Sequence, residues 1–144
     1  MRQLVLSTHA SAAGPGGART AQTRGMKAKD QLGRAGEEFA AEYLSAAGYD
    51  VLERNWRCPQ GEIDVVARDG NTLVITEVKT RSSLDYGHPF EAVTAAKLSR
   101  LYLLAAAWIR EHPAECSRWR VDAVSVLLPR AEQEPVIEHL KGIG

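Results

Sequence analysis

Apolar residues recur at helical spacing in two segments of the chain, 27–48 and 89–111. In the first segment the apolar stripe consists of Phe39, Ala40, Tyr43, Leu44 and Ala47. A stripe of this kind packs against a core, so the spacing predicts an amphipathic helix in each segment. Gly48 suits the left-handed position that ends a helix, and Pro89 suits the first turn of the second one.

Five further segments are rich in β-branched residues or alternate between apolar and polar positions, which is typical of strands. They cover 49–56, 61–68, 71–80, 118–128 and 135–140, and the last is expected at the edge of the sheet. Asp69-Gly70, between the second and third of these segments, is a strong hairpin signal. The order strand, helix, strand between residues 72 and 127 requires a crossover and a parallel pair. The pattern therefore predicts an α/β fold with a mixed sheet flanked by helices.

The first 25 residues are rich in Gly, Ala, Ser and Thr and show no periodicity. This composition predicts a disordered N-terminal arm at 1–25 and a single domain at 26–144. Met26 stands where the periodic sequence begins, so either Met1 or Met26 is the initiator. The apolar run Leu4–Leu6 is too short for the core of a signal peptide, and no apolar run reaches the roughly 18 residues of a membrane span.

Two cysteines, Cys58 and Cys116, lie far apart and form no Cys-x-x-Cys pair. This argues against a zinc site and a disulfide scaffold and predicts a cytoplasmic protein. The chain carries 18 basic and 18 acidic residues, and three of the basic ones fall in the arm, so residues 26–144 have a net charge of −3. Proteins that bind DNA by neutralising phosphates are usually more basic. A role in nucleic-acid binding therefore requires a local basic patch, or metal ions that offset acidic groups.

The predicted hairpin carries four charged residues inside otherwise apolar strands: Glu62, Asp64, Glu77 and Lys79. If Asp69 and Gly70 are the two turn residues, Asp64 lies opposite Ile75 and Glu62 lies opposite Glu77. All four charged side chains then project from one face, because opposed residues and residues two apart share a face. In this register Asp64 and Glu77 are diagonal neighbours about 7–8 Å apart, so both carboxylates can bind one cation.

Glu37 adds a third acidic group, because its helical spacing places it at the edge of the apolar stripe, towards the sheet. Oxygen ligands without His or Cys favour Mg²⁺ or Mn²⁺, and Asp64, Glu77 and Glu37 are the expected metal ligands and catalytic residues. The Lys79 ammonium is expected to orient a water molecule or to stabilise charge that develops on a phosphate. Glu62 shares the face, but its place at the start of a strand favours a solvated residue over a ligand.

Several stretches of the sequence resemble a known family. They are GRAGEEFAAEYLSAAGYDVLERNWRCPQGEIDVVARDGNTLVITEVKTRSS, YGHPFEAV, the lysine at 97 and the Arg-Leu pair at 100–101. These stretches resemble the YraN-like bacterial proteins (uncharacterised protein family 0102), and the resemblance covers nearly all of residues 27–144. That family is similar to the PD-(D/E)XK nucleases, close to the archaeal Holliday-junction resolvases.

The resemblance implies a restriction-endonuclease-like fold and a nuclease or nucleic-acid-binding role. Asp64 would match the Asp of the superfamily, and Glu77 with Lys79 would match its Glu-x-Lys. Gly36-Glu37 would supply the acid carried by a helix. Thr76 stands where the family usually has a more apolar residue; we expect little effect, because it falls on the face opposite the charges.

Two functions of different class are consistent with these residues. The first is a magnesium-dependent endonuclease-like hydrolase that acts on DNA, with branched DNA as one candidate substrate. The second is a non-catalytic nucleic-acid-binding or interaction protein that retains the nuclease fold. Candidate phosphate contacts are Arg57, Arg81, Lys97 and Arg100. A homodimer would suit cleavage of two strands, and Trp56, Trp108 and Trp119 are expected to pack in the core or at its rim.

Overall fold

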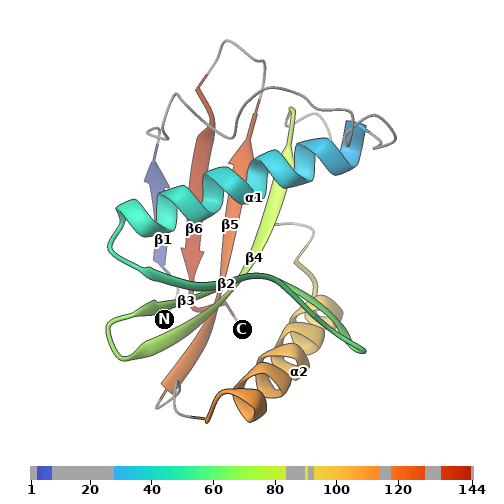
Figure 1. Cartoon of the computed structure of the whole chain (residues 1–144). Helices are drawn as coiled ribbons and strands as arrows, with labels where there is room; N and C mark the ends of the chain where they lie inside the picture. The colour runs from blue at the N-terminus through green and yellow to red at the C-terminus, as the bar shows by residue number, and fades with distance from the viewer. Residues whose placement is uncertain are drawn as a thin grey trace.

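The computed structural model describes residues 3–7, 28–83, 90, 93–113, 118–128 and 134–143. The strands within these residues are β1 (Gln3–Ser7), β2 (Asp50–Cys58), β3 (Gly61–Asp69), β4 (Thr72–Arg81), β5 (Arg118–Leu127) and β6 (Val136–Lys141). The helices are α1 (Ala28–Ala46) and α2 (Ala95–Glu111). The strands form one sheet in the order β1-β6-β5-β4-β3-β2 (Figure 1). Its β4–β5 pair is parallel and its other pairs are antiparallel, which confirms the predicted mixed α/β sheet.

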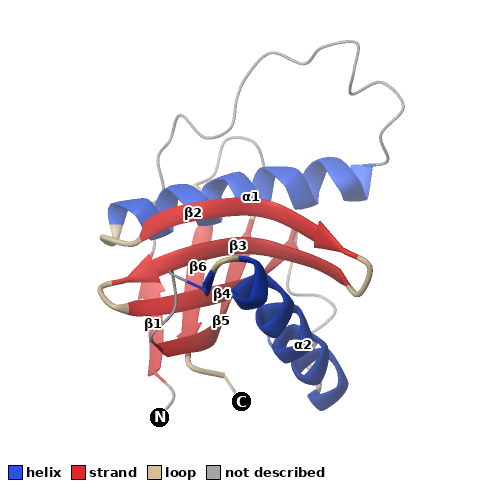
Figure 2. Ribbon diagram, turned by 60° about the horizontal axis from the view of Figure 1, so that its bottom comes forward, coloured by secondary structure: helices blue, strands red, loops and turns tan. Residues whose placement is uncertain are grey.

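The two helices lie on opposite sides of this sheet (Figure 2). On the α1 side, Ala40 and Leu44 pack in one cluster with residues of the sheet such as Val74. On the α2 side, a second cluster includes Leu101, Leu104, Ala105, Trp108, Leu73 and Ile75. Successive side chains of a strand point to opposite faces. Even-numbered positions of β4 therefore face α1, and odd-numbered positions face α2.

Both ends of α1 lie close to the prediction, because the apolar stripe and the terminating glycine act together. Gly48 has φ 96°, which is the left-handed conformation expected just after a helix. Its backbone N–H donates to the Ser45 carbonyl at 3.1 Å, and the Tyr49 N–H donates to the Leu44 carbonyl at 3.0 Å. These bonds turn the chain into β2. Within the described residues, no helix has the length and apolar character needed to cross a membrane.

The second helix begins later than predicted. It starts at Ala95, after the N-cap residue Thr94, whose hydroxyl accepts a hydrogen bond from the Lys97 N–H at 3.3 Å. A side-chain cap of this kind satisfies a backbone donor that has no partner inside the helix. Pro89 lies outside the described residues. Phe90 and Val93 precede the helix, yet they still pack against the core on the α2 side.

The hairpin register differs from the prediction by two residues. Asp69 pairs with Thr72 and Val65 pairs with Thr76, so the turn residues are Gly70 and Asn71. Gly70 has φ 61°, and a positive φ at the first turn residue is a conformation that hairpins assign to glycine. A shift by two keeps the paired side chains on their faces. The pairing ends at Val65 and Thr76, however, and Ile63 and Val65 pack on opposite sides of the sheet, so the predicted shared face of Asp64 with Glu77 and Lys79 does not follow from the register.

A group of buried polar residues joins α1 to β5 and β6. The Asp122 carboxylate is fully buried and accepts hydrogen bonds from Arg120 Nε at 2.9 Å and from the Gly142 N–H at 2.9 Å. His139 Nε2 lies 2.7 Å from the same carboxylate, and His139 Nδ1 lies 3.0 Å from the Tyr43 hydroxyl on α1. These donors hold the pKa of Asp122 below its usual value despite burial, so the group is a charged anchor for α1.

The N-terminal residues correct a further prediction. Gln3–Ser7 form β1, and β1 pairs with β6 from Gln3↔Lys141 to Ser7↔Ile137. The predicted disordered arm is therefore wrong for these five residues, and β6 is not the edge of the sheet. The remaining arm residues, 8–25, lie outside the described residues. Local sequence carries no signal for this pairing, because Leu4–Leu6 is short and its partner strand is far away in the chain.

Deletion of residues 1–25 is now expected to lower the melting temperature by roughly 5 °C or more. Cross-strand pairs each contribute about 0.2–1 kcal/mol, and a protein of this size loses about 2–4 °C per kcal/mol. Val5→Pro in the full chain should reproduce much of the loss, because proline disrupts the pairing of a strand. Calorimetry measures both variants. Unchanged melting in both variants would show that β1 adds nothing to stability.

Candidate active site

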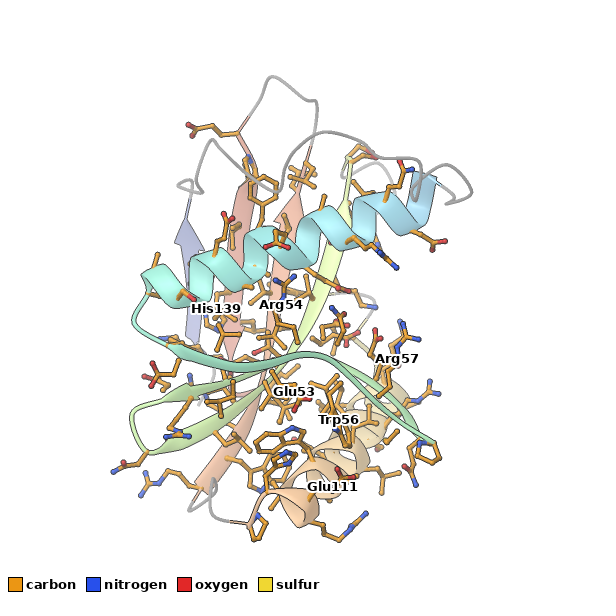
Figure 3. The ribbon with its side chains drawn as sticks, in the orientation of Figure 1. Glu53, Arg54, Trp56, Arg57, Glu111 and His139 are labelled. Carbon is orange, nitrogen blue, oxygen red and sulfur yellow. The ribbon has the colours of Figure 1, made fainter. Side chains whose placement is uncertain are left out.

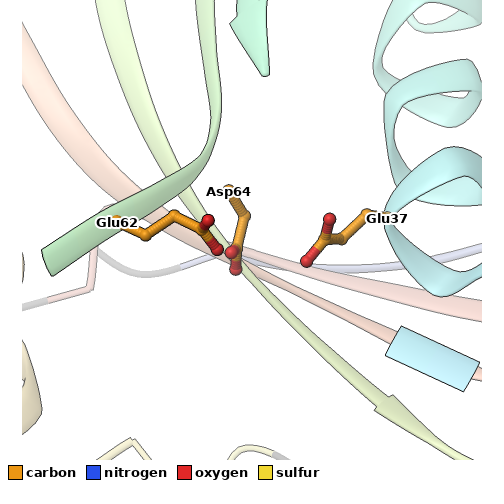
Figure 4. Close-up of side chains that lie close together, drawn as sticks. All are labelled: Glu37, Glu62 and Asp64. Atoms are coloured by element: carbon orange, nitrogen blue, oxygen red, sulfur yellow. The ribbon is translucent and has the colours of Figure 1, made fainter. Parts of the chain in front are cut away.

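Three carboxylates meet beside the β3 strand. One oxygen each from Glu37, Glu62 and Asp64 lie within 4.8 Å of one another. Glu37 reaches from α1 towards the two β3 residues, and the three carboxylates point at a common space (Figure 4). All three side chains are partly buried. We call these three residues the acidic cluster.

Asp64 occupies the position where β3 and β4 stop pairing. The last paired residues of this ladder are Val65 and Thr76. One step beyond, Asp64 Oδ2 accepts a hydrogen bond from the backbone N–H of Val78 at 2.8 Å. The carboxylate thus replaces a carbonyl oxygen as the partner of that N–H, and this bond fixes the direction of the side chain. Charged groups are tolerated in these strands because they lie where the ladder ends.

Glu37 reaches Asp64 because the preceding residue is glycine. Gly36 is buried, and a Cβ built on it would overlap the Thr80 side chain of β4. The absence of a side chain therefore lets α1 approach β4 closely, beside the acidic cluster. The prediction that Glu37 faces the sheet is thus met in a specific way. Glu37 approaches the sheet from the α1 side. The alternation of β4 instead directs Glu77 and Lys79 to the α2 side.

The acidic cluster has the electrostatics of groups that repel one another. Burial, then the nearby Glu77 charge, raises the pKa of Asp64 to about 8, although the Val78 hydrogen bond acts in the opposite direction. Burial and the Glu62 charge also raise the pKa of Glu37. Both shifts disfavour the charged carboxylate. A cation placed between these carboxylates would favour their charged form and lower their pKa values.

Glu77 is close to the cluster but is engaged elsewhere. Its carboxylate lies 3.2 Å from Lys79 Nζ, and both side chains are about four-fifths buried, with 19% and 18% of their surfaces exposed. It raises the pKa of Asp64, so it is near, yet its oxygens lie outside the group of three. Lys79 in turn contacts Lys97 of α2, and this neighbouring ammonium lowers the pKa of Lys97. The Glu-x-Lys pair therefore lies between the acidic cluster and α2.

Glu62 belongs to the acidic cluster, although its place at the start of a strand favoured a solvated residue. Its Oε2 accepts from Arg57 Nε at 2.8 Å, while Arg57 remains 79% exposed on the outer side of β2 (Figure 3). Ile63 and Val65 pack on opposite sides of the sheet, so the period of two does not hold around Asp64 and did not predict this grouping. Glu62 is the second residue of β3 and its side chain is 32% exposed, so its role as a ligand stays a prediction.

The other predicted phosphate contacts lie around the same region. Arg100 is exposed, and its Nε donates to the Gln60 carbonyl at 3.3 Å, next to Gly61 with φ 143°. Lys97 is also exposed, at the first turn of α2. Arg81 is partly buried, and one guanidinium nitrogen donates to the Thr80 carbonyl at 3.2 Å. Arg57, Arg100 and Lys97 are thus available to anions, and Arg81 is partly committed to its own strand.

The donor set fits a hard divalent cation. Oxygens that share one Mg²⁺ lie at most about 4.2 Å apart, because each bond is about 2.1 Å. The acidic cluster is within 4.8 Å and needs only small side-chain rotations to meet this limit. A set of carboxylates without His or Cys suits magnesium or manganese rather than zinc. Glu37, Glu62 and Asp64 are the residues that would hold such an ion.

Comparisons with known proteins identify the relatives of this chain. The model of the uncharacterised protein family UPF0102 matches residues 36–126. A UPF0102 protein of Arthrobacter sp. (strain FB24) is 60% identical over 119 residues, which are 83% of this chain and 100% of the relative. A UPF0102 protein of Paenarthrobacter aurescens (strain TC1) is 58% identical over 118 residues, which are 82% of this chain and 97% of the relative. The matched residues include the acidic cluster and the strand β4, which carries the Glu-x-Lys pair, and this chain belongs to the uncharacterised protein family UPF0102.

Proposed function

We propose that the protein is a metal-dependent nuclease that hydrolyses phosphodiester bonds in DNA. The observation that carries this proposal is the convergence of Glu37, Glu62 and Asp64 beside the Glu77–Lys79 pair. Carboxylates that raise each other's pKa are costly to keep together, and such arrangements are concentrated at functional sites. The bound cation would polarise the phosphate and lower the pKa of an attacking water.

The chain's own residues would carry out the remaining tasks. The acidic cluster would fix the position of the cation. The hydrogen bond from the Val78 N–H would fix the orientation of the Asp64 carboxylate. The Lys79 ammonium, buried next to Glu77, would stabilise negative charge on the phosphate as it develops. Water is partly excluded at Lys79, which strengthens this interaction.

The exposed cations around the site would bind the flanking phosphates. Arg57 lies next to the β2–β3 turn, and Arg100 reaches this turn from α2. Lys97 lies one turn earlier on α2 and contacts Lys79. Contacts with phosphates position a nucleic acid without reading its sequence. These cations would form a local basic rim around the acidic cluster. Such a rim is needed for DNA binding, because residues 26–144 have a net charge of −3.

A cleavage assay tests this function. Purified protein with Mg²⁺ or Mn²⁺ is expected to cut at least one of three substrates: single-stranded DNA, duplex DNA or a four-way junction. A chelator should stop the reaction. If the protein binds these DNAs and cuts none of them with either metal, the non-catalytic binding function is correct instead.

A further inference from the structure

Two lysine side chains from different elements meet beside the Glu77 carboxylate. Lys79 lies on β4, Lys97 lies in the first turn of α2, and the two side chains contact each other. We call these two residues the lysine pair. Lys79 is only 18% exposed and lies 3.2 Å from Glu77, so its ammonium is largely held out of water. Lys97 is exposed, and its long flexible side chain is free to point away from a like charge, yet it lies against Lys79.

The charges around the lysine pair do not balance. Arg81, on the same face of β4 as Lys79, also repels Lys97, whereas Glu77 attracts it. These four groups, three cations and one carboxylate, carry a surplus of two positive charges. A hydrogen bond with Lys79, and then the Lys79 charge, lowers the pKa of Lys97, and Glu77 offsets only part of this effect. An anion bound between the two lysines would instead favour the charged form of both.

The position of Lys97 in α2 is also unfavourable for a cation. The N-terminus of a helix carries a partial positive charge, which favours anions. Lys97 is the third residue of α2, and the first turn of this helix contains no acidic residue. Its backbone is fixed there by the hydrogen bond from its N–H to the Thr94 hydroxyl. Neither helix stability nor an ion pair within the described residues accounts for Lys97, whereas binding of an anion does.

The lysine pair lies next to the residues that would hold the cation. Asp64 of the acidic cluster is close enough to Glu77 for the Glu77 charge to raise the Asp64 pKa, and Glu77 in turn lies against Lys79. Arg100, one turn after Lys97, donates instead to a carbonyl of the β2–β3 turn at 3.3 Å. An anion held by Lys97 would therefore lie beside the Glu-x-Lys pair, and an anion held by Arg100 would lie beside that turn.

We propose that Lys97 and Lys79 bind the same phosphate, the one whose bond is cut, so that α2 contributes a catalytic residue to the site. This inference rests on the proposed function. It separates Lys97 from Arg57 and Arg100, which would bind the flanking phosphates. Both lysines act through their charge and transfer no proton. Two ammoniums stabilise the negative charge that develops on the phosphate in the transition state more than Lys79 does alone.

Binding of inorganic phosphate tests the lysine pair separately from cleavage. The full chain, with a chelator present, is titrated with phosphate, and binding is followed by phosphorus NMR. Lys97→Ala and Lys79→Ala are each expected to weaken binding by about tenfold or more, the scale of one hydrogen bond to a charged group. Arg110→Ala removes an exposed cation from the last turn of α2 and should bind phosphate like the wild type. Equal affinity in the wild type and Lys97→Ala, or no binding by the wild type, would overturn the inference.

Cleavage kinetics distinguish a catalytic residue from a contact with a flanking phosphate. With Mg²⁺ and saturating DNA, Lys97→Ala is expected to lower the maximal single-turnover rate by about a hundredfold, with little change in the DNA concentration that gives half of this rate. Arg100→Ala should mainly raise that concentration. A Lys97→Ala variant that behaves like Arg100→Ala would contradict the inference and assign Lys97 to a flanking phosphate. If the wild type cuts no DNA but phosphate binding still depends on Lys97, the proposed function fails and the lysine pair stands as an anion site.

Thermal melting in phosphate-free buffer shows whether these losses have a structural cause. Because Lys97 is exposed and repelled by Lys79, Lys97→Ala should melt at the wild-type temperature or slightly above it. Alanine is also the residue most favourable to a helix. Lys97→Met keeps the apolar part of the side chain and should lose phosphate binding and cleavage to the same extent. Melting several degrees lower in both variants, together with these losses, would identify Lys97 as a structural residue and refute its catalytic role.

Discussion

Asp64→Asn is expected to abolish metal-dependent DNA cleavage, whereas Lys79→Ala is expected to slow it by about a hundredfold or more. Asparagine keeps the shape of Asp64 and an oxygen that can accept from the Val78 N–H, but it removes the anion from the acidic cluster. Lys79 contributes no oxygen ligand, so its loss removes only a charge that stabilises the transition state, and a hundredfold is the usual scale for one such group. Single-turnover rates with Mg²⁺ and with Mn²⁺ measure both effects.

A thermal shift with metal separates the two variants further. A cation that binds only the folded protein raises its melting temperature. This rise should persist in Lys79→Ala and vanish in Asp64→Asn. Arg110→Ala is a suitable control, because Arg110 is an exposed residue in the last turn of α2 and belongs to neither the acidic cluster nor the Glu-x-Lys pair. Undiminished cutting by Asp64→Asn would point to a contaminating nuclease and would contradict the assigned site.

The shared face of Glu77 and Lys79 was predictable even though the hairpin register was not. The sequence placed the turn at Asp69-Gly70, whereas the structure places it at Gly70-Asn71. Local turn preferences cannot distinguish these alternatives well, because both put Gly70 in the turn. The side-chain period of two made the error harmless. Periodicity therefore predicted the face of Glu77, whereas the place of Asp64 depends on the break in alternation between Ile63 and Val65.

The membership of the acidic cluster depended on contacts that periodicity does not contain. Glu62 joins the cluster, and Glu77 is held by Lys79, because the β3–β4 ladder ends at Val65 and Thr76. The approach of α1 depends on a close contact between Gly36 and Thr80, which are far apart in the sequence. The pairing of β1 with β6 is equally non-local. Such features follow from tertiary packing rather than from local preference.

In the metal-free protein, wild-type stability is expected to fall as the pH rises from about 4 to 8, and this fall should be much smaller in Asp64→Asn, where only Glu37 of the acidic cluster keeps a raised pKa. The folded-state pKa of Asp64 is raised to about 8 from an ordinary value of 3.8, chiefly by burial and then by Glu77. Between these values the folded state retains a proton that the unfolded state has released. Stability therefore decreases with pH in this window, by up to about 1.4 kcal/mol per pH unit.

Urea unfolding between pH 5 and 9, with a chelator present, measures this difference. Asparagine cannot titrate, so Asp64→Asn should gain stability relative to the wild type as the pH rises. Glu77→Gln should show a smaller gain, because it removes the second cause of the raised Asp64 pKa.

Asp122→Asn should change stability in the opposite direction. The pKa of Asp122 is lowered, so its charge stabilises the fold above its unfolded-state pKa and the variant should be less stable throughout this range. Magnesium should oppose the wild-type decline most strongly at pH 8, where it replaces the proton at the acidic cluster. Parallel stability curves for the wild type and Asp64→Asn would show that Asp64 is ionised at neutral pH without a metal, and that the acidic cluster is not strained.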